Sequence, residues 1–155
     1  MRLKDVVQYE HKLDSLFRAT AEVTDLELQA HWAKYLCVLS SGYIEKSVRA
    51  IYGEYAKLRT PPQIGRFVSR RLGEFQNAKM SKIVDLTKLF DETWALQLEL
   101  TFAGEVTDSI NSLVANRHSI AHGQDTSVSI ARVKTWHEKS RELIAHLEGQ
   151  CGLNV

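Results

Sequence analysis

The sequence predicts an all-α protein, on two observations about its breaks and its apolar spacing. Only two prolines occur, adjacent at Pro61 and Pro62, and no alternating stretch of β-branched residues is bounded by turn signals. Apolar residues instead recur three and four positions apart along most of the chain. The 155 residues are 44% hydrophobic and 25% charged, which suits one globular domain over residues 1–155 with its own core.

The chain begins with two expected helices of unequal length. Residues 6–20 repeat apolar side chains at helical spacing, which predicts the first. The second is expected over about residues 25–57 and is apolar on two sides, with Leu36 on one and Ile51 on the other. Two apolar sides predict that this helix is central and has neighbours on both. The adjacent prolines end it, because a proline ring disfavours helix at the preceding residue.

Three shorter helices are expected in the middle of the chain. The first covers about residues 63–75. Ser81 is expected to be the N-cap of the second, since a serine side chain can accept a hydrogen bond from a free N–H of the first turn. Asp91 is expected to cap a short continuation through Leu98 for the same reason.

Two long helices are expected to complete the chain. One covers about residues 102–122 and ends at Gly123, which occupies the position where helices often close with a left-handed residue. Residues 124–127 supply a turn and caps. The last covers about residues 128–147, with Gly149 as its expected stop.

Composition restricts the location and the partners. The net charge of +1 provides no global reason to expect a nucleic-acid or membrane partner, so any anion binding must be local. No segment approaches the ~18 uninterrupted apolar residues of a membrane helix, and the amino terminus has no apolar run of signal-peptide length. A cytoplasmic protein with no membrane partner is therefore expected. Cys37 and Cys151 have no C-x-x-C pairing and are expected to be free thiols.

The expected helix over residues 102–122 places a permanent charge in its apolar face. Five apolar residues gather on that face of an ideal helix: Val106, Ile110, Leu113, Val114 and Ala121. Arg117 falls within the face. An arginine stays charged at any pH that a protein meets, so it needs an anion, water or backbone carbonyls. Either a carboxylate of the chain, such as Glu45 on the central helix, or a ligand satisfies it; Glu45 could also be engaged locally by Arg49.

Two histidines follow Arg117. His118 and His122, four residues apart, are expected to share a flank of the helix. A histidine can exchange a proton at neutral pH and an arginine can hold a phosphate through two hydrogen bonds, so together they suit phosphodiester chemistry. The alternatives are a solvent-facing His118 and a His122 that caps the helix. The histidine spacing also fits zinc, but no third ligand is evident, and no metal or cofactor is expected.

The segment from Leu113 to Gly123 resembles a known signature. The run Leu113-Val114-x-x-Arg117-His118-x-Ile120-Ala121-His122-Gly123 is similar to the R-x4-6-H motif of the HEPN superfamily, whose arginine is typically followed by Asn, Asp or His. The stretch from Ser41 to Arg49 also resembles the RiboL-PSP-HEPN group of small prokaryotic HEPN-like nucleases. The resemblance implies an antiparallel bundle of four to five main helices. It also implies a homodimer in which two motifs form a composite, metal-independent ribonuclease site.

The resemblance further implies roles for single residues. A ribose 2′-OH would attack the adjacent phosphodiester and leave a cyclic phosphate and a 5′-OH. Arg117 would bind the scissile phosphate, His122 would move a proton and His118 would assist by hydrogen bonding. Glu45 and Asn116 would support the motif.

The biological role that the resemblance implies is a toxin or defence effector. Its partners would be RNA, a second copy of the chain and a neutralising antitoxin or partner protein. One alternative is a noncatalytic HEPN module that binds RNA, a nucleotide or a partner protein. Another is a plain helical interaction domain in which Arg117 is paired structurally.

A basic strip over residues 59–82 also bears on RNA. It contains one acid, Glu74, and six cations: Arg59, Arg66, Arg70, Arg71, Lys79 and Lys82. Arg66, Arg70 and Arg71 are expected to track a phosphate backbone. The alternative is a solvated helix face balanced by the acids of residues 85–108. Phe67 and Phe75 are expected in the core and not as platforms for base stacking.

Overall fold

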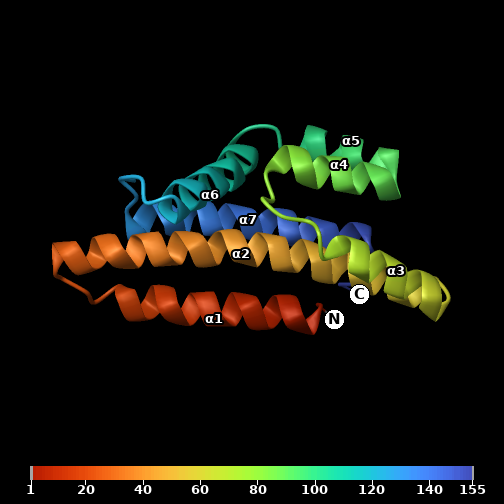
Figure 1. Ribbon diagram of the computed structural model, residues 1–155, viewed down its shortest axis with the longest axis horizontal. Helices are drawn as coiled ribbons and strands as arrows, with labels where there is room; N and C mark the ends of the chain where they lie inside the picture. Colours follow the sequence, from red (N-terminus) through yellow and green to blue (C-terminus); the bar gives the residue numbers. More distant parts are fainter. Residues whose placement is uncertain (1, 155) are drawn as a thin grey trace.

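The computed structural model describes residues 2–154, and within them the chain forms helices and no strand, which confirms the all-α prediction. The helices are α1 (Lys4–Thr20), α2 (Leu26–Arg59), α3 (Pro62–Leu72), α4 (Met80–Phe90), α5 (Glu92–Thr101), α6 (Glu105–Ala121) and α7 (Ile130–Gln150). The four long helices α1, α2, α6 and α7 form a bundle, in which consecutive helices run antiparallel (Figure 1). The described part of the chain contains no helix that is both long and apolar enough to cross a membrane.

Helix α2 is central, as predicted. It packs against α1, α3, α6 and α7, and buried residues recur along it on more than one side. Asp25 caps its start by accepting a hydrogen bond from the Leu28 backbone N–H (2.8 Å). It ends at Arg59, and the backbone of the C-cap residue Thr60 is extended (φ −135°, ψ 161°), as the following proline requires.

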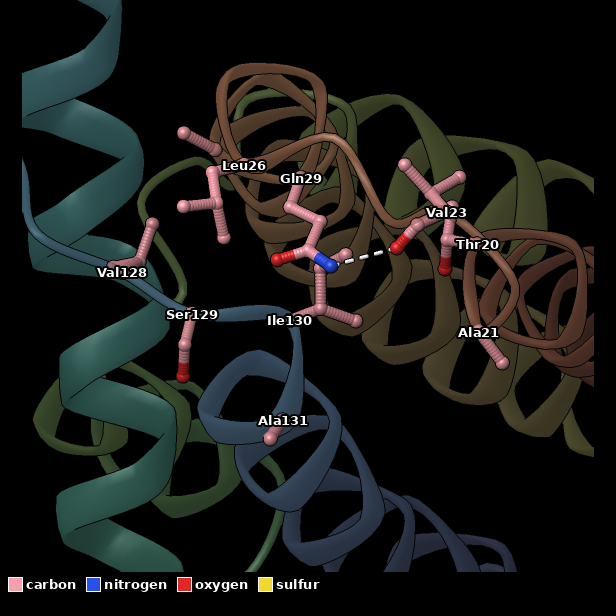
Figure 2. Close-up of a pocket in the computed structure, with 10 residues that line it drawn as sticks. Thr20, Ala21, Val23, Leu26, Gln29, Val128, Ser129, Ile130 and Ala131 are labelled. Carbon is pink, nitrogen blue, oxygen red and sulfur yellow. Dashed lines mark hydrogen bonds between the residues drawn. The ribbon is translucent and has the colours of Figure 1, made fainter.

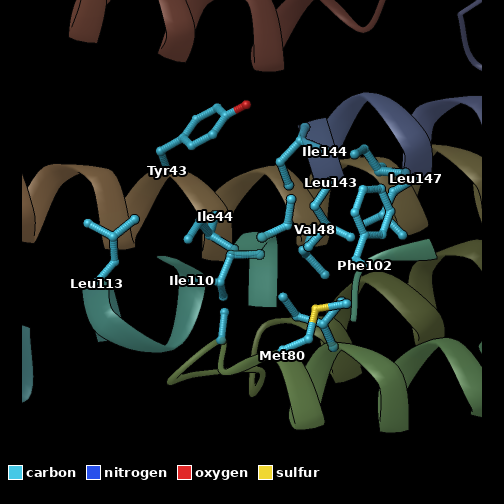
Figure 3. Packing of buried hydrophobic residues seen from close by; sticks show 14 of the residues in the cluster. Tyr43, Ile44, Val48, Met80, Phe102, Ile110, Leu113, Leu143, Ile144 and Leu147 are labelled. Carbon is cyan, nitrogen blue, oxygen red and sulfur yellow. The ribbon is translucent and has the colours of Figure 1, made fainter. Parts of the chain in front are cut away.

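The core lies where α2, α6 and α7 meet. Ile44 and Val48 of α2 pack with Ile110 of α6 and with Leu143 and Ile144 of α7 (Figure 3). These side chains are completely buried. Burial of each contributes roughly 1.5–3 kcal/mol to the free energy of folding, so this layer fixes the position of α6 on α2.

Helices α4 and α5 form a hairpin above the bundle (Figure 1). Asp91 caps α5 as predicted, since its carboxylate accepts a hydrogen bond from the Trp94 N–H at 3.0 Å. The prediction of Ser81 as a cap is wrong. The N-cap is Lys79, two residues earlier, and the N–H of the first helical residue, Met80, donates to the side-chain oxygen of Asn111 on α6 (3.0 Å). A contact between helices replaces the local cap.

Helices α6 and α7 are both closed by a glycine with a left-handed backbone conformation. Gly123 has a φ of +69°, and its N–H and that of Gln124 donate to α6 carbonyls at 3.1 and 2.9 Å, which confirms the predicted stop. The predicted stop of α7 at Gly149 is wrong, because Gly152 (φ +68°) closes that helix instead. Cys151 precedes it and continues the buried face.

The start of α6 also differs from the prediction. The helix begins at Glu105 and not near residue 102. Phe102 is the C-cap of α5, and Gly104 takes a φ of +114°, which interrupts the helical backbone.

A network of buried charges ties the amino terminus to the end of α7. Glu148 is 0% exposed and Glu10 is 2% exposed. Arg2 joins them, at 2.6 Å to Glu148 and 2.7 Å to Glu10. Tyr43 and Arg141 also donate to Glu10. Burial raises the pKa of Glu10, but the hydrogen bonds from Arg2 and Tyr43 outweigh it and hold the pKa below its usual value.

His137 of α7 lies inside the core beside this network. It is 1% exposed, stacks on Phe17 (ring centroids 5.5 Å apart) and meets Tyr43 edge-on. Neither ring nitrogen has a hydrogen-bond partner among residues 2–154. Burial and the nearby charge of Arg141 lower its pKa to about 4, so the imidazole is neutral at physiological pH.

Candidate functional site

The predicted motif lies in the last turns of α6, where the helix leaves the core. Leu113 and Val114 are buried, Arg117 is half-buried, and His118 and His122 are exposed. Ala121, which we expected in the apolar face, is exposed. The buried stripe therefore ends one turn before Arg117, and the guanidinium lies at the margin between core and solvent instead of inside a dry face.

Arg117 has no acidic partner in the described chain. Its one side-chain hydrogen bond within residues 2–154 is long and runs from Nη1 to Oδ1 of Asn77 (3.5 Å). A hydrogen bond of that length is weak. Among residues 2–154, no carboxylate oxygen forms an ion pair with Arg117. The charge is thus available to an anion that approaches from solvent.

Glu45 is engaged elsewhere. Its carboxylate accepts a hydrogen bond from Nη2 of Arg49, one turn along α2, at 3.0 Å. Arg49 in turn donates from Nε and Nη2 to the backbone carbonyl of Phe75. The alternative of a Glu45–Arg117 ion pair is therefore wrong. Glu45 orients Arg49, and Arg49 holds the α3–α4 connection, residues 73–79, against α2.

The α3–α4 connection positions the partner of Arg117. Asn77 has a φ of +53°, in the left-handed region that Asn tolerates better than most residues. The Phe75 carbonyl before it and the Met80 N–H after it are both held by other helices. Sequence reasoning missed Asn77, because no spacing rule links a loop residue to a helix 40 positions later.

The two histidines adjoin one another, as predicted from their spacing. Their ring centroids lie 4.3 Å apart, with an angle of 55° between the planes. His122 is the C-cap residue of α6, and its backbone N–H donates to the His118 carbonyl (3.1 Å). Both proposed alternatives thus describe the geometry, since His118 faces solvent and His122 ends the helix. Neither position prevents an exposed imidazole from reaching a ligand.

The Asn116 side chain forms no hydrogen bond with Arg117, His118 or His122. Its side-chain amide donates to the Ser112 carbonyl at 2.8 Å, back along α6. The contact holds the side chain against its own helix. The structure therefore brings together Arg117, His118 and His122, and adds Asn77, but places Glu45 and Asn116 outside this group.

The predicted basic residues Arg66, Arg70 and Arg71 are all exposed on α3. Arg71 pairs loosely with Glu74 at 3.5 Å. The prediction for Phe67 is wrong: this side chain is 63% exposed, whereas Phe75 is half-buried against the core. Helix α3 packs on α2 through Gly65, where an added Cβ would lie 3.3 Å from Lys57 Cα, and this docking turns Phe67 outward.

A pocket of about 420 Å³ lies one loop beyond the motif, where the start of α2 meets the start of α7 (Figure 2). Leu26, Val128 and Ile130 contribute apolar side chains to it. The Gln29 amide donates across the pocket wall to the Val23 carbonyl at 2.6 Å. No acid or histidine lines this pocket, so it offers apolar surface and not proton transfer.

Metal ligation finds no support in the described chain. Within residues 2–154, no three His, Cys, Asp or Glu side chains are grouped so that they could hold a metal ion. Cys37 and Cys151 are buried free thiols, as predicted. Burial raises the pKa of Cys37 to about 11, which keeps that thiol protonated and unreactive.

Comparison with known proteins gives one family match. Neither the search of curated proteins nor that of solved structures found a significant match. The RiboL-PSP-HEPN family model matches residues 2–152, which is nearly the whole chain and includes every helix described above. This match confirms the resemblance inferred from the sequence. The chain belongs to the RiboL-PSP-HEPN family.

Proposed function

We propose that the protein is a metal-independent endoribonuclease whose site is built on Arg117, His118 and His122. The observation that carries the proposal is a guanidinium that has no acidic partner among residues 2–154, beside two exposed imidazoles whose centroids are 4.3 Å apart. Family membership supports a HEPN-type nuclease or RNA-binding module in general. Cleavage is the more specific step, and the chemistry of the three side chains supports it.

In the proposed reaction, the ribose 2′-oxygen attacks the adjacent phosphorus. The 2′-O–P bond forms, the P–O5′ bond breaks, and the products are a 2′,3′-cyclic phosphate and a 5′-hydroxyl. Arg117 binds the non-bridging oxygens, where negative charge develops. His122 takes the proton from the 2′-OH or delivers one to the leaving 5′-oxygen, and His118 assists by hydrogen bonding.

A second copy of the chain completes the proposed site. The motif of one subunit lies on an open helix end, so an isolated subunit would leave the reacting phosphate in contact with water. Leu26, 80% exposed at the nearby pocket, offers apolar surface that a partner could bury. In this arrangement Leu26→Glu converts a dimer to a monomer in sedimentation velocity and reduces cleavage. A wild-type protein that sediments as an active monomer contradicts the composite site.

The direct test is cleavage of a total RNA pool in excess chelator. Arg117→Ala and His122→Ala should each lower cleavage by roughly 10²-fold or more, and the wild-type products should carry cyclic phosphate and 5′-hydroxyl ends. His11→Ala is the matched control, because His11 is an exposed histidine on α1, away from the motif. Absence of cleavage by freshly purified, folded wild-type protein on every RNA pool would overturn the proposal.

The proposed biological role is that of a cytoplasmic toxin or defence effector with a neutralising partner. Expression of the wild-type chain in bacteria should then slow growth, and His122→Ala should relieve the effect. A wild-type chain that is harmless at the same expression level would argue against this role.

A noncatalytic RNA-binding module is the second candidate function. The exposed arginines and phenylalanine of α3 favour it, because they suit binding without any chemistry at α6. RNA binding that survives His122→Ala together with absence of cleavage by the wild type would select this function.

A further inference from the structure

Helix α3 exposes an aromatic side chain in the middle of a cationic face. Phe67 is 63% exposed, and Arg66, Arg70 and Arg71 around it are also exposed. Residues three and four apart share a helix face, so Arg70 and Arg71 lie one turn beyond Phe67 on the outer side. The helix contains three arginines and no acid. Burial of an exposed aromatic ring by a ligand is favourable, and the charges around the ring indicate which kind of ligand would bury it.

The opposite face of α3 explains why Phe67 points outward. Gly65 and Leu72 are buried, and Gly65 allows the α3 backbone to approach Lys57 of α2 closely. Among the described helices, α3 makes its main contacts with α2 alone. The outer face therefore has no partner within the described chain and is not needed to attach the helix.

We infer that α3 binds single-stranded RNA, with an unpaired base stacked on Phe67 and the phosphates held by Arg66 and Arg70. The inference rests on the proposed function for the identity of the ligand. Arg66 and Arg70, at one-turn spacing, supply positive charge along a backbone, and the aromatic ring of Phe67 beside them supplies a surface for a base. In a duplex the bases are stacked on one another and cannot reach the ring, so the arrangement favours a single strand.

The α3–α4 connection links this surface to the motif. Leu72 ends α3, and Asn77, which contacts Arg117, follows five residues later. The five helical residues from Phe67 to Leu72 rise about 7.5 Å and the next five span at most about 18 Å, so one short strand can contact both Phe67 and the motif. Lys79 and Lys82, both exposed, continue the positive charge beside this connection. Helix α3 would thus guide RNA toward Arg117.

Fluorescence anisotropy with a labelled oligoadenylate tests the inference. The His122→Ala background is used, so that cleavage does not interfere. Phe67→Ala should weaken binding roughly tenfold or more, the usual cost of losing one base–aromatic stack. Its salt dependence should stay unchanged, because no charge is removed. Phe67→Trp should keep the affinity and add a tryptophan signal that the oligonucleotide quenches.

Charge reversal separates the phosphate contacts from stacking. Arg66→Glu/Arg70→Glu should weaken binding and lower the salt slope by about 1.4, as expected for two lost contacts to a single strand. Lys12→Glu/Arg18→Glu on α1 and Leu89→Ala on α4 are matched controls, since all three side chains are exposed and belong to other helices. They should leave the affinity close to that of the starting protein.

Several outcomes would overturn the inference. These are an unchanged affinity in Phe67→Ala, an equal loss for a duplex of the same sequence, or no RNA binding by the folded protein. An α3 substitution that spares RNA binding but abolishes capture of a protein partner would assign this face to that partner instead. If Phe67→Ala weakens binding while the wild type cleaves nothing, the inference stands and the proposed nuclease activity fails.

Discussion

The arginines at the two ends of the bundle have opposite surroundings. Arg2, near the amino terminus, donates to the buried carboxylates of Glu10 and Glu148 at 2.7 and 2.6 Å. The side chain of Arg117, at the far end of α6, has one hydrogen bond within residues 2–154, of 3.5 Å to a neutral amide. The chain supplies the counter-charge in the first case and leaves it to water or a ligand in the second. The comparison separates an arginine that stabilises the fold from one that is available for binding.

The largest expected effect is on catalysis at Arg117. Arg117→Ala should lower kcat by roughly 10²–10³-fold, as loss of a donor to a developing oxyanion does. Arg117→Lys should recover part of that loss, because the charge remains but the two-pronged geometry does not. The free energy of unfolding should change by less than about 0.5 kcal/mol, since no internal ion pair is broken. A large loss of stability would place Arg117 in the same class as Arg2.

In contrast to Arg117→Ala, substitution of Arg2 should lower the stability of the fold. Arg2→Met leaves Glu148 buried without its cationic partner, so the free energy of unfolding should fall by about 3 kcal/mol. Urea denaturation at neutral pH measures the loss. Arg18→Met is the control, because Arg18 is exposed on α1 and has one hydrogen bond of 3.5 Å, to Ser15. Equal effects of the two substitutions would show that the buried network contributes nothing specific.

Acid should weaken the core through His137. Its pKa is lowered to about 4 in the folded chain, below the value of about 6.5 expected when unfolded. Between these two pKa values the unfolded chain binds more protons than the folded chain. The neutral His137 therefore contributes its full share to the free energy of unfolding above the unfolded pKa, and this share is lost as the pH falls toward the folded pKa. Between about pH 7 and pH 5 the free energy of unfolding should drop by roughly 2 kcal/mol.

His137→Phe isolates that contribution. The new ring keeps the contacts with Phe17 and Tyr43 but cannot be protonated, so the part of the pH dependence due to His137 should disappear. Thermal unfolding followed by circular dichroism at several pH values provides the comparison. If the variant loses as much stability as the wild type over the same range, Glu10 and other carboxylates account for the acid sensitivity.

The local features of this fold were predictable from the sequence, and the features formed across helices were not. Gly123 and the His118–His122 pair follow from helical geometry over a few residues, and both predictions are confirmed. Arg2 and Glu148 lie 146 positions apart, and no local pattern pairs them. The Ser81 cap failed because Asn111, from another helix, satisfies the Met80 N–H.

Phe67 shows why a local pattern can also mislead. An amphipathic rule assigns a phenylalanine to the core, but it does not determine which face of a short helix docks. On α3 the small Gly65 decides that question, since it allows close approach to Lys57. Glu45 is a different case: the sequence offered a local pair with Arg49, one turn away on α2, as the alternative to a pair with Arg117, and the local pair is the one that forms.

The smallest expected effect concerns Asn77, which accepts the one side-chain hydrogen bond that Arg117 makes within the described chain. Asn77→Gly removes the side-chain oxygen but keeps the left-handed backbone, so kcat/KM should fall only about two- to fivefold, as for one weak hydrogen bond. Asn77→Ala should cause a similar kinetic loss and also lower the free energy of unfolding by about 1 kcal/mol, because alanine is strained at a φ of +53°.

Steady-state cleavage and urea denaturation of both Asn77 variants separate positioning from folding. If both variants lose activity but only Asn77→Ala loses stability, the amide of Asn77 orients Arg117 and does not stabilise the fold. If Asn77→Gly keeps full activity, the 3.5 Å contact has no catalytic consequence, and Arg117 is positioned by α6 and its ligand alone.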